Sequence, residues 1–193
     1  MKINRFILTI GILLFSVLFT IAAEKKVKTD TAESNKLVKL IESKVFYIVV
    51  DDAFPTGNSS ISISSKYGEK TIGGEGHVSL ATNQGEIFFL DTVATGKLPF
   101  FGRAYSVPYG EGGGIEFDKA QINQESLNVV KKRKKQYVEY RFTVRNRNDV
   151  FTIYVEAYSN GRCNVKVNSN NRASISYDGK ISAIPEEKMK YLQ

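Results

Sequence analysis

Residues 138–145 read Val-Glu-Tyr-Arg-Phe-Thr-Val-Arg, and apolar and polar side chains alternate without a break along this stretch. Successive side chains of a β-strand point to opposite faces of its sheet, so this period of two predicts a half-buried strand. The same period recurs at residues 151–157, 163–167 and 173–177. Turn-forming residues separate the strands at 146–149, 159–161, 169–171 and 178–179. Tightly connected strands about 10 residues apart predict a mainly β fold, an antiparallel meander that forms a sandwich or a barrel.

The third of these strands contains Cys163, the only cysteine of the chain. Cys163 shares an apolar face with Val165 and Val167, so we expect its thiol to be buried, protonated and unreactive. One cysteine cannot form an internal disulfide, and the fold must therefore be stabilised by its core.

One short helix is predicted before the first strand. Leu37, Leu40 and Ile41 recur at helical spacing, and Asp30 is placed to cap the helix with Glu33 three residues later. We therefore expect a single N-terminal helix beside an otherwise β-rich fold.

The first strand is predicted at residues 45–50, a run of β-branched and aromatic side chains. Asp51 and Asp52 follow and are expected to end it, with a turn at Pro55. Between residues 60 and 93 short apolar pairs are separated by glycines, which predicts short strands or hairpins of uncertain register.

Residues 1–23 have the features of a cleaved signal peptide. Lys2 and Arg5 precede an uncharged apolar stretch at residues 6–23, which ends in small residues followed by Glu24. A single-pass anchor is the alternative, because about 18 apolar residues can just span a bilayer. No cysteine stands directly after the stretch, where a lipid would be attached. We expect a periplasmic or secreted protein with no transmembrane span after cleavage.

Cleavage would leave a flexible leader at residues 24–35, a single β-rich domain at residues 36–185 and a charged C-terminal tail at residues 186–193. A chain of this length can bury a core without disulfides or metals. Residues 1–23 contain two of the 27 basic residues and none of the 20 acidic ones, so cleavage would leave a mild net charge of +5. The chain lacks the concentrated run of basic residues that nucleic-acid binding requires, so no nucleic-acid partner is expected.

The most unusual stretch is residues 98–117, which combine aromatic residues, glycines and a lone cation. In a binding loop, Arg103 would be a fork for a carboxylate or phosphate, and Tyr105 and Tyr109 would be amphipathic platforms. The structural alternative is a wide bend between strands in which the glycines take positive φ. No Lys-Ser/Thr pair follows the glycines, so the stretch is not a nucleotide-binding loop.

Residues 98–117, with the phrase Gly-Arg-Ala-Tyr-Ser at 102–106, and the closing segment Asn-Ser-Asn-Asn-Arg-Ala-Ser-Ile-Ser-Tyr at 168–177 carry a resemblance. Over about residues 36–184 the chain resembles the secreted bacterial family known as domain of unknown function 4251. The resemblance implies export and a β architecture, and the family has no assigned activity. The segment at residues 67–97 looks longer and richer in glycine than the corresponding segment of that family. An extra hairpin within these residues would leave the core unchanged.

No catalytic, metal or cofactor site is predicted. His77 is the only histidine, and the sequence does not place near it the set of carboxylate partners that a metal site would need, so neither a metal site nor a catalytic triad is supported. Glu111, Glu116 and Asp118 are the acids near the aromatic loop, and an envelope hydrolase would need two of them across a cleft.

Five consecutive cations lie between two predicted strands: Lys131, Lys132, Arg133, Lys134 and Lys135. They could make weak contact with an anionic surface, or form a solvated hairpin tip that discourages edge-to-edge sheet pairing.

The function that the sequence favours is a non-enzymatic binding or structural module of the bacterial envelope. Its partner would be an unknown small molecule, glycan or envelope protein. The alternatives are the carboxylate hydrolase and a carrier of an apolar ligand inside a barrel, which would need a cavity lined by apolar side chains.

Overall fold

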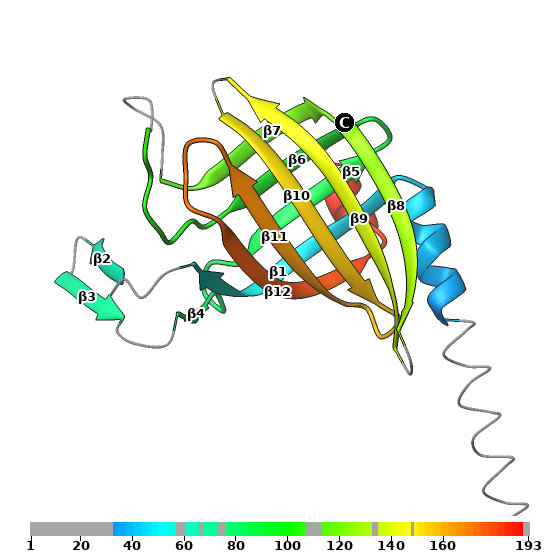
Figure 1. Cartoon of the computed structure of the whole chain (residues 1–193), viewed down its shortest axis with the longest axis horizontal. Helices are drawn as coiled ribbons and strands as arrows, with labels where there is room; N and C mark the ends of the chain where they lie inside the picture. Colours follow the sequence, from blue (N-terminus) through cyan, green and yellow to red (C-terminus); the bar gives the residue numbers. More distant parts are fainter. Residues whose placement is uncertain are drawn as a thin grey trace, which may run out of the picture.

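The computed structural model describes residues 33–56, 61–65, 68–72, 76–106, 113–132, 135–147 and 149–190. The fold is mainly β: a nine-strand antiparallel sheet curls into a half-barrel, with a short N-terminal helix beside it (Figure 1). The strand order is β7-β6-β5-β1-β12-β11-β10-β9-β8, and the two-residue strand β4 pairs beside β1. Of the two architectures left open by the sequence, the barrel-like one is therefore present.

The main sheet contains β1 (Val45–Pro55), β4 (Val78–Ser79), β5 (Gly85–Leu90), β6 (Val93–Leu98), β7 (Ile115–Gln121), β8 (Asn123–Lys132), β9 (Lys135–Asn146), β10 (Asp149–Tyr158), β11 (Arg162–Ser169) and β12 (Ile175–Ser182). A separate hairpin, β2 (Ile61–Ser65) with β3 (Gly68–Ile72), lies apart from this sheet (Figure 1). A hairpin outside the main sheet is thus present between residues 60 and 93, where the sequence predicted short strands or hairpins.

The meander of β9 to β12 confirms the alternation that predicted it. The apolar face of β9, with Val138, Tyr140, Phe142 and Val144, is buried, and each strand pairs antiparallel with the next. Cys163 lies on the same buried face at 3% exposure, as expected. Its burial, with a further contribution from Asp178 and then Asp51, raises the thiol pKa to about 12.

The turn predicted at Asp178 and Gly179 is wrong, because both residues lie inside β12. At Gly179 the strand comes so close to β1 that an added Cβ would lie 2.1 Å from the Val49 carbonyl oxygen. The glycine allows two backbones to approach each other and does not reverse the chain.

The end predicted for the first strand at Asp51 and Asp52 is also wrong. β1 continues to Pro55 through a β-bulge between Val50 and Asp52. β1 pairs with β5 on one side and β12 on the other, which makes it a central strand of the sheet.

The N-terminal helix is present over residues 33–42 (blue in Figure 1). Leu37 and Ile41 are buried in the core and Leu40 packs against it, as their spacing predicted. The described helix begins three residues inside the segment that the sequence assigned to the leader, and the predicted cap Asp30 lies outside the described residues. Two residues after the helix, Lys44 has a φ of 54° and forms an ion pair of 2.7 Å with Glu125.

Aromatic side chains occupy the interior of the half-barrel. The rings of Phe46 and Phe89 stack with centroids 4.2 Å apart, and Phe142 contacts Phe89 edge-on at 5.0 Å. The first strand of the order, β7, meets the last strand but one, β9, where the side chain of Asn146 donates a hydrogen bond to the Glu116 carbonyl. An interior filled in this way does not favour an apolar carrier.

The C-terminal tail contains a single helical turn, α2 (Glu186–Met189). Lys188 pairs with Glu86 and lies over the rings of Tyr47 and Phe88, so the turn is held against β1 and β5. In the part of the chain that is described, no helix is both long and apolar enough to cross a membrane.

Candidate functional site

Two loops that carry the sequence resemblance lie side by side. The first is residues 99–106, called the 99–106 loop below, and the second connects β11 to β12. Ala104 and Arg172 form an isolated β-bridge, the amide of Tyr105 donates to the Asn171 carbonyl at 2.8 Å, and the amide of Ala173 donates to the Arg103 carbonyl at 2.9 Å. Segments about 70 residues apart thus form one surface.

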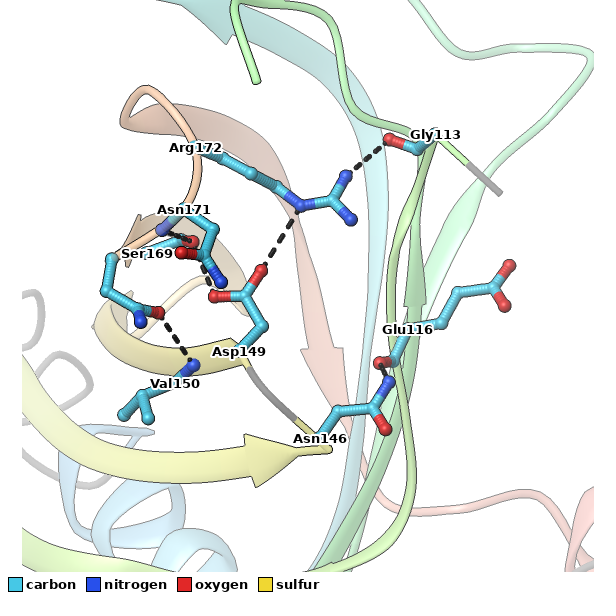
Figure 2. Close-up of polar contacts among 9 residues, drawn as sticks. Gly113, Glu116, Asn146, Asp149, Val150, Ser169, Asn171 and Arg172 are labelled. Atoms are coloured by element: carbon cyan, nitrogen blue, oxygen red, sulfur yellow. Dashed lines mark hydrogen bonds and ion pairs between the residues drawn. The ribbon is translucent and has the colours of Figure 1, made fainter. Parts of the chain in front are cut away.

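A buried arginine joins these loops to the start of β7. Arg172 is 5% exposed, and its Nε donates to Asp149 Oδ2 at 3.3 Å while its Nη1 donates to the Gly113 carbonyl at 2.8 Å (Figure 2). The guanidinium also lies over the Phe100 ring, 5.4 Å from the centroid. Arg172 therefore connects β10, the 99–106 loop and the segment that leads into β7.

One further hydrogen bond to Asp149, and others between its neighbours, extend this network. The hydroxyl of Ser169 donates to Asp149 Oδ1 at 2.7 Å and accepts from the amide of Asn171 at 2.9 Å (Figure 2). Asn170 accepts from the amide of Val150 at 2.9 Å. A buried ion pair is favourable only when its remaining polar atoms are also satisfied, and this one meets that condition.

The buried side chain of Tyr177 holds the start of the 99–106 loop. Its hydroxyl donates to the Pro99 carbonyl at 2.7 Å. Burial raises the pKa of this hydroxyl far above its ordinary value of 10.0, and the charge of Arg172 opposes that shift only in part. The hydroxyl stays protonated and remains a donor to the loop.

The outer side of the 99–106 loop presents two of the three predicted binding residues. Arg103 is exposed, and Tyr105 is 67% exposed. Within the described residues the Arg103 guanidinium has no ion-pair partner. Tyr109 lies outside those residues. The structure thus brings Arg103 and Tyr105 together at the surface of a loop whose inner side is held by buried groups.

The acids of the hydrolase hypothesis do not face one another across a cleft. Glu116 and Asp118 are exposed positions two residues apart on β7. Glu116 lies 3.5 Å from Lys97, and Asp118 accepts a hydrogen bond of 3.2 Å from Thr95. Glu111 lies outside the described residues. Each described acid has an ordinary surface partner, and this arrangement does not favour hydrolysis.

His77 is exposed, as expected, but it has a carboxylate partner that the sequence did not indicate. Its Nε2 lies 2.8 Å from Asp52, and its ring stacks on Phe54 with centroids 5.1 Å apart. Asp52 is 25 residues away in sequence and is brought close by the pairing of β1 with β4. Among the described residues, no group of three or more His, Cys, Asp or Glu side chains is placed to hold a metal ion.

The chain matches the DUF4251 family, described as a domain of unknown function, over residues 28–181. The chain belongs to this family. A crystal structure of a DUF4251 family protein from Bacteroides eggerthii is similar to it over 80% of this chain and 89% of that one, with 12% identity and a TM-score of 0.48. No curated protein matches the chain. Membership of the DUF4251 family indicates no activity.

Sequence reasoning missed the buried residues of this DUF4251 protein's site. Arg172 lay within the quoted resemblance but was not given a role, and Asp149 was treated as a turn residue. One sequence feature could have identified them: Asp149 and Arg172 are charged residues beside strand positions that are otherwise apolar. Such residues are rarely buried unless they are paired.

Proposed function

We propose that this DUF4251 protein is exported and acts as a non-enzymatic binding module of the bacterial envelope. Its contact surface is the outer side of the 99–106 loop, and its partner is a small molecule, glycan or envelope protein that carries a carboxylate or phosphate. The observation that supports this is the exposure of Arg103 and Tyr105 on a loop that Arg172, Asp149 and Tyr177 hold from its inner side.

The chemistry of the two exposed side chains favours an anionic partner. A guanidinium without an ion pair offers a planar fork of N–H donors that matches carboxylate or phosphate geometry. The neighbouring phenol adds apolar area and a polar tip at low entropic cost. Because the loop is held in place before binding, little ordering entropy is lost when the partner arrives.

The export half of the proposal rests on residues 1–23. It is tested by expressing the full chain in a bacterium, isolating the periplasmic and culture fractions, and measuring the mass of the protein. A product that begins near Glu24 supports export with cleavage, and a full-length product held in the membrane contradicts cleavage.

The binding half is tested by a thermal-shift screen of the chain from residue 24 onwards. The panel contains acidic and neutral oligosaccharides, peptidoglycan fragments, anionic lipids, fatty acids and divalent metals. A ligand at about a hundred times its dissociation constant should add roughly 2.7 kcal/mol, or on the order of 5 to 10 °C in melting temperature.

Two variants separate the loop from general charge effects. Arg103→Ala should abolish the shift produced by an anionic ligand, whereas Arg145→Ala should retain it, because Arg145 is an exposed arginine on β9. A shift that survives Arg103→Ala, or a panel that gives no shift at all, contradicts a binding surface of this chemistry on the loop.

A further inference from the structure

A polar groove lies on the outer face of the sheet, over β10, β11, β12 and β1. Its volume is about 510 Å³, which is in the range of small-ligand sites. Its charged lining includes Glu156, Arg162, Asp178, Lys180 and Asp52. These strands are adjacent in the sheet (Figure 1). The lining residues come from all four strands, so the groove crosses the strands and does not run along one of them.

One wall of the groove is a row of carboxylates. Glu156 is directly opposite Asn164, Asn164 is opposite Asp178, and Asp178 is opposite Asp52. Like charges placed directly opposite each other on neighbouring strands destabilise a sheet. The facing Asp178 and Asp52 therefore lower the folding stability of the protein, and the sheet does not need this pair for its own pairing.

The next row along the strands has the opposite charge. Arg162 is directly opposite Lys180, which again places like charges face to face. Lys180 lies 3.7 Å from Asp51, but Arg162 has no ion-pair partner in the described part of the chain. The groove thus contains a guanidinium without an ion pair and, one row away, the carboxylates of Glu156, Asp178 and Asp52. Within the described residues none of these three carboxylates forms an ion pair with a lysine or arginine.

The carboxylates are oriented by groups that are not permanent cations. Asn164 donates a hydrogen bond of 2.9 Å to Asp178, and the Tyr158 hydroxyl donates one of 3.3 Å to Glu156. Asp52 contacts His77. Such partners fix the direction of a carboxylate and leave most of its charge available to a ligand.

The β-bulge in β1 completes the acidic wall. Val50 and Ala53 are both buried, so the extra residue at the bulge lets Asp51 and Asp52 both lie on the outer side. Bulges occur often beside functional sites, where they redirect side chains. The feature that sequence reasoning took for the end of a strand is here part of the groove.

The spacing of the two rows defines the length of a ligand that contacts both. The rows are two residues apart along the strands, and a strand rises about 3.3 Å per residue, so they are separated by about 7 Å. Two residues of extended peptide also span about 7 Å. We propose that this groove binds a short peptide as a zwitterion, with its ammonium group on the acidic row and its carboxylate on Arg162. This proposal does not depend on the 99–106 loop.

The test is isothermal titration of the chain from residue 24 onwards with alanyl-alanine. The matched probes are N-acetyl-alanyl-alanine, which lacks the ammonium, alanyl-alanine amide, which lacks the carboxylate, and glycine, which is too short to contact both rows. We expect alanyl-alanine to bind and each of the other three to bind at least about tenfold more weakly, since each loses a charge-assisted contact.

Two groove variants and two controls locate the binding. Arg162→Gln and Asp178→Asn should each weaken alanyl-alanine binding by about tenfold or more. Arg145→Gln, on the outer face of β9, and Arg103→Ala, on the loop, should leave it unchanged. The melting temperatures of both groove variants should be equal to or above that of the wild type, because each removes one partner of a like-charged pair.

The proposal is wrong if the wild type does not bind alanyl-alanine at millimolar concentrations, if a blocked probe binds equally well, or if Arg162→Gln binds like the wild type. Loss of binding in Arg103→Ala with retention in Arg162→Gln would place the peptide on the loop and overturn the groove. Failure of the loop hypothesis alone leaves these measurements unaffected.

Discussion

Arg172 and Arg103 lie on two segments joined by a single β-bridge, and their guanidinium groups have opposite environments. Arg172 is buried, and Asp149, Gly113 and Phe100 contact it, whereas Arg103 is exposed without an ion pair among the described residues. A buried charge needs partners to be tolerated, and an exposed one does not. Arg172 therefore stabilises the 99–106 loop, and Arg103 is available to contact a partner.

The largest effect is expected from Arg172→Ala. This change leaves the Asp149 carboxylate buried without its cation, which should cost about 3 to 5 kcal/mol. For a domain of this size the melting temperature should fall by on the order of 10 °C, measured by circular dichroism with urea unfolding in parallel. If the variant has the same melting temperature and urea midpoint as the wild type, the network adds no stability.

Removing both charges sharpens the same comparison. The double variant Arg172→Met with Asp149→Leu should be more stable than the sum of its single variants predicts, by about 0.5 to 3 kcal/mol, because neither charge is left alone. Urea unfolding of the wild type, the two single variants and the double variant gives this coupling. Strict additivity would mean that the two side chains do not interact.

Alkaline pH tests the buried side of the molecule. Burial raises the pKa of Cys163 from 9.0 to about 12 and raises that of Tyr177 above 10.0. Both groups stay protonated in the folded protein but ionise in the unfolded chain. The contribution of Cys163 is complete below pH 9.0 and is lost as the pH rises towards about 12, and that of Tyr177 declines as the pH rises above 10.0. Urea unfolding across this range should show the decline, and Tyr177→Phe should make it shallower. An unchanged slope in Tyr177→Phe would contradict the assignment.

The smallest effects on stability are expected at the exposed side of the loop. Arg103→Ala and Tyr105→Ala should each change the free energy of unfolding by no more than about 0.5 kcal/mol, because neither removes a buried contact. The same urea measurements check this. A loss as large as that of Arg172→Ala would show that these side chains hold the loop and are not simply presented by it.

The parts of the fold that could be predicted are those in which residues close together in the sequence determine the structure. Alternation within residues 138–145 depends only on which face of one strand is buried, and the same holds for Leu37 and Ile41 in the helix. The pairing of Asp149 with Arg172 depends instead on the connection between β11 and β12, which no local period reveals. The loop containing Arg103 was identified by composition, but its buried anchors were not.

Two errors have a common physical cause. Asp51 with Asp52, and Asp178 with Gly179, have the composition of strand ends and turns, and they were interpreted in that way. In the structure these pairs lie on neighbouring strands, where the bulge in β1 meets the close approach of β12. Tertiary contact between two irregular positions overrides the local preference of each.

The pairing of β1 with β12 also determines when the sheet can be completed during synthesis. β5 can pair with β1 early, but the other edge of β1 has no partner until the chain has been made as far as Ser182. At a synthesis rate of about 5 to 20 residues per second, that delay is on the order of ten seconds. Non-local pairing of this kind also folds slowly. A nascent chain cannot complete its central strand during that time, and an unfinished sheet is the state that the export proposed above would require.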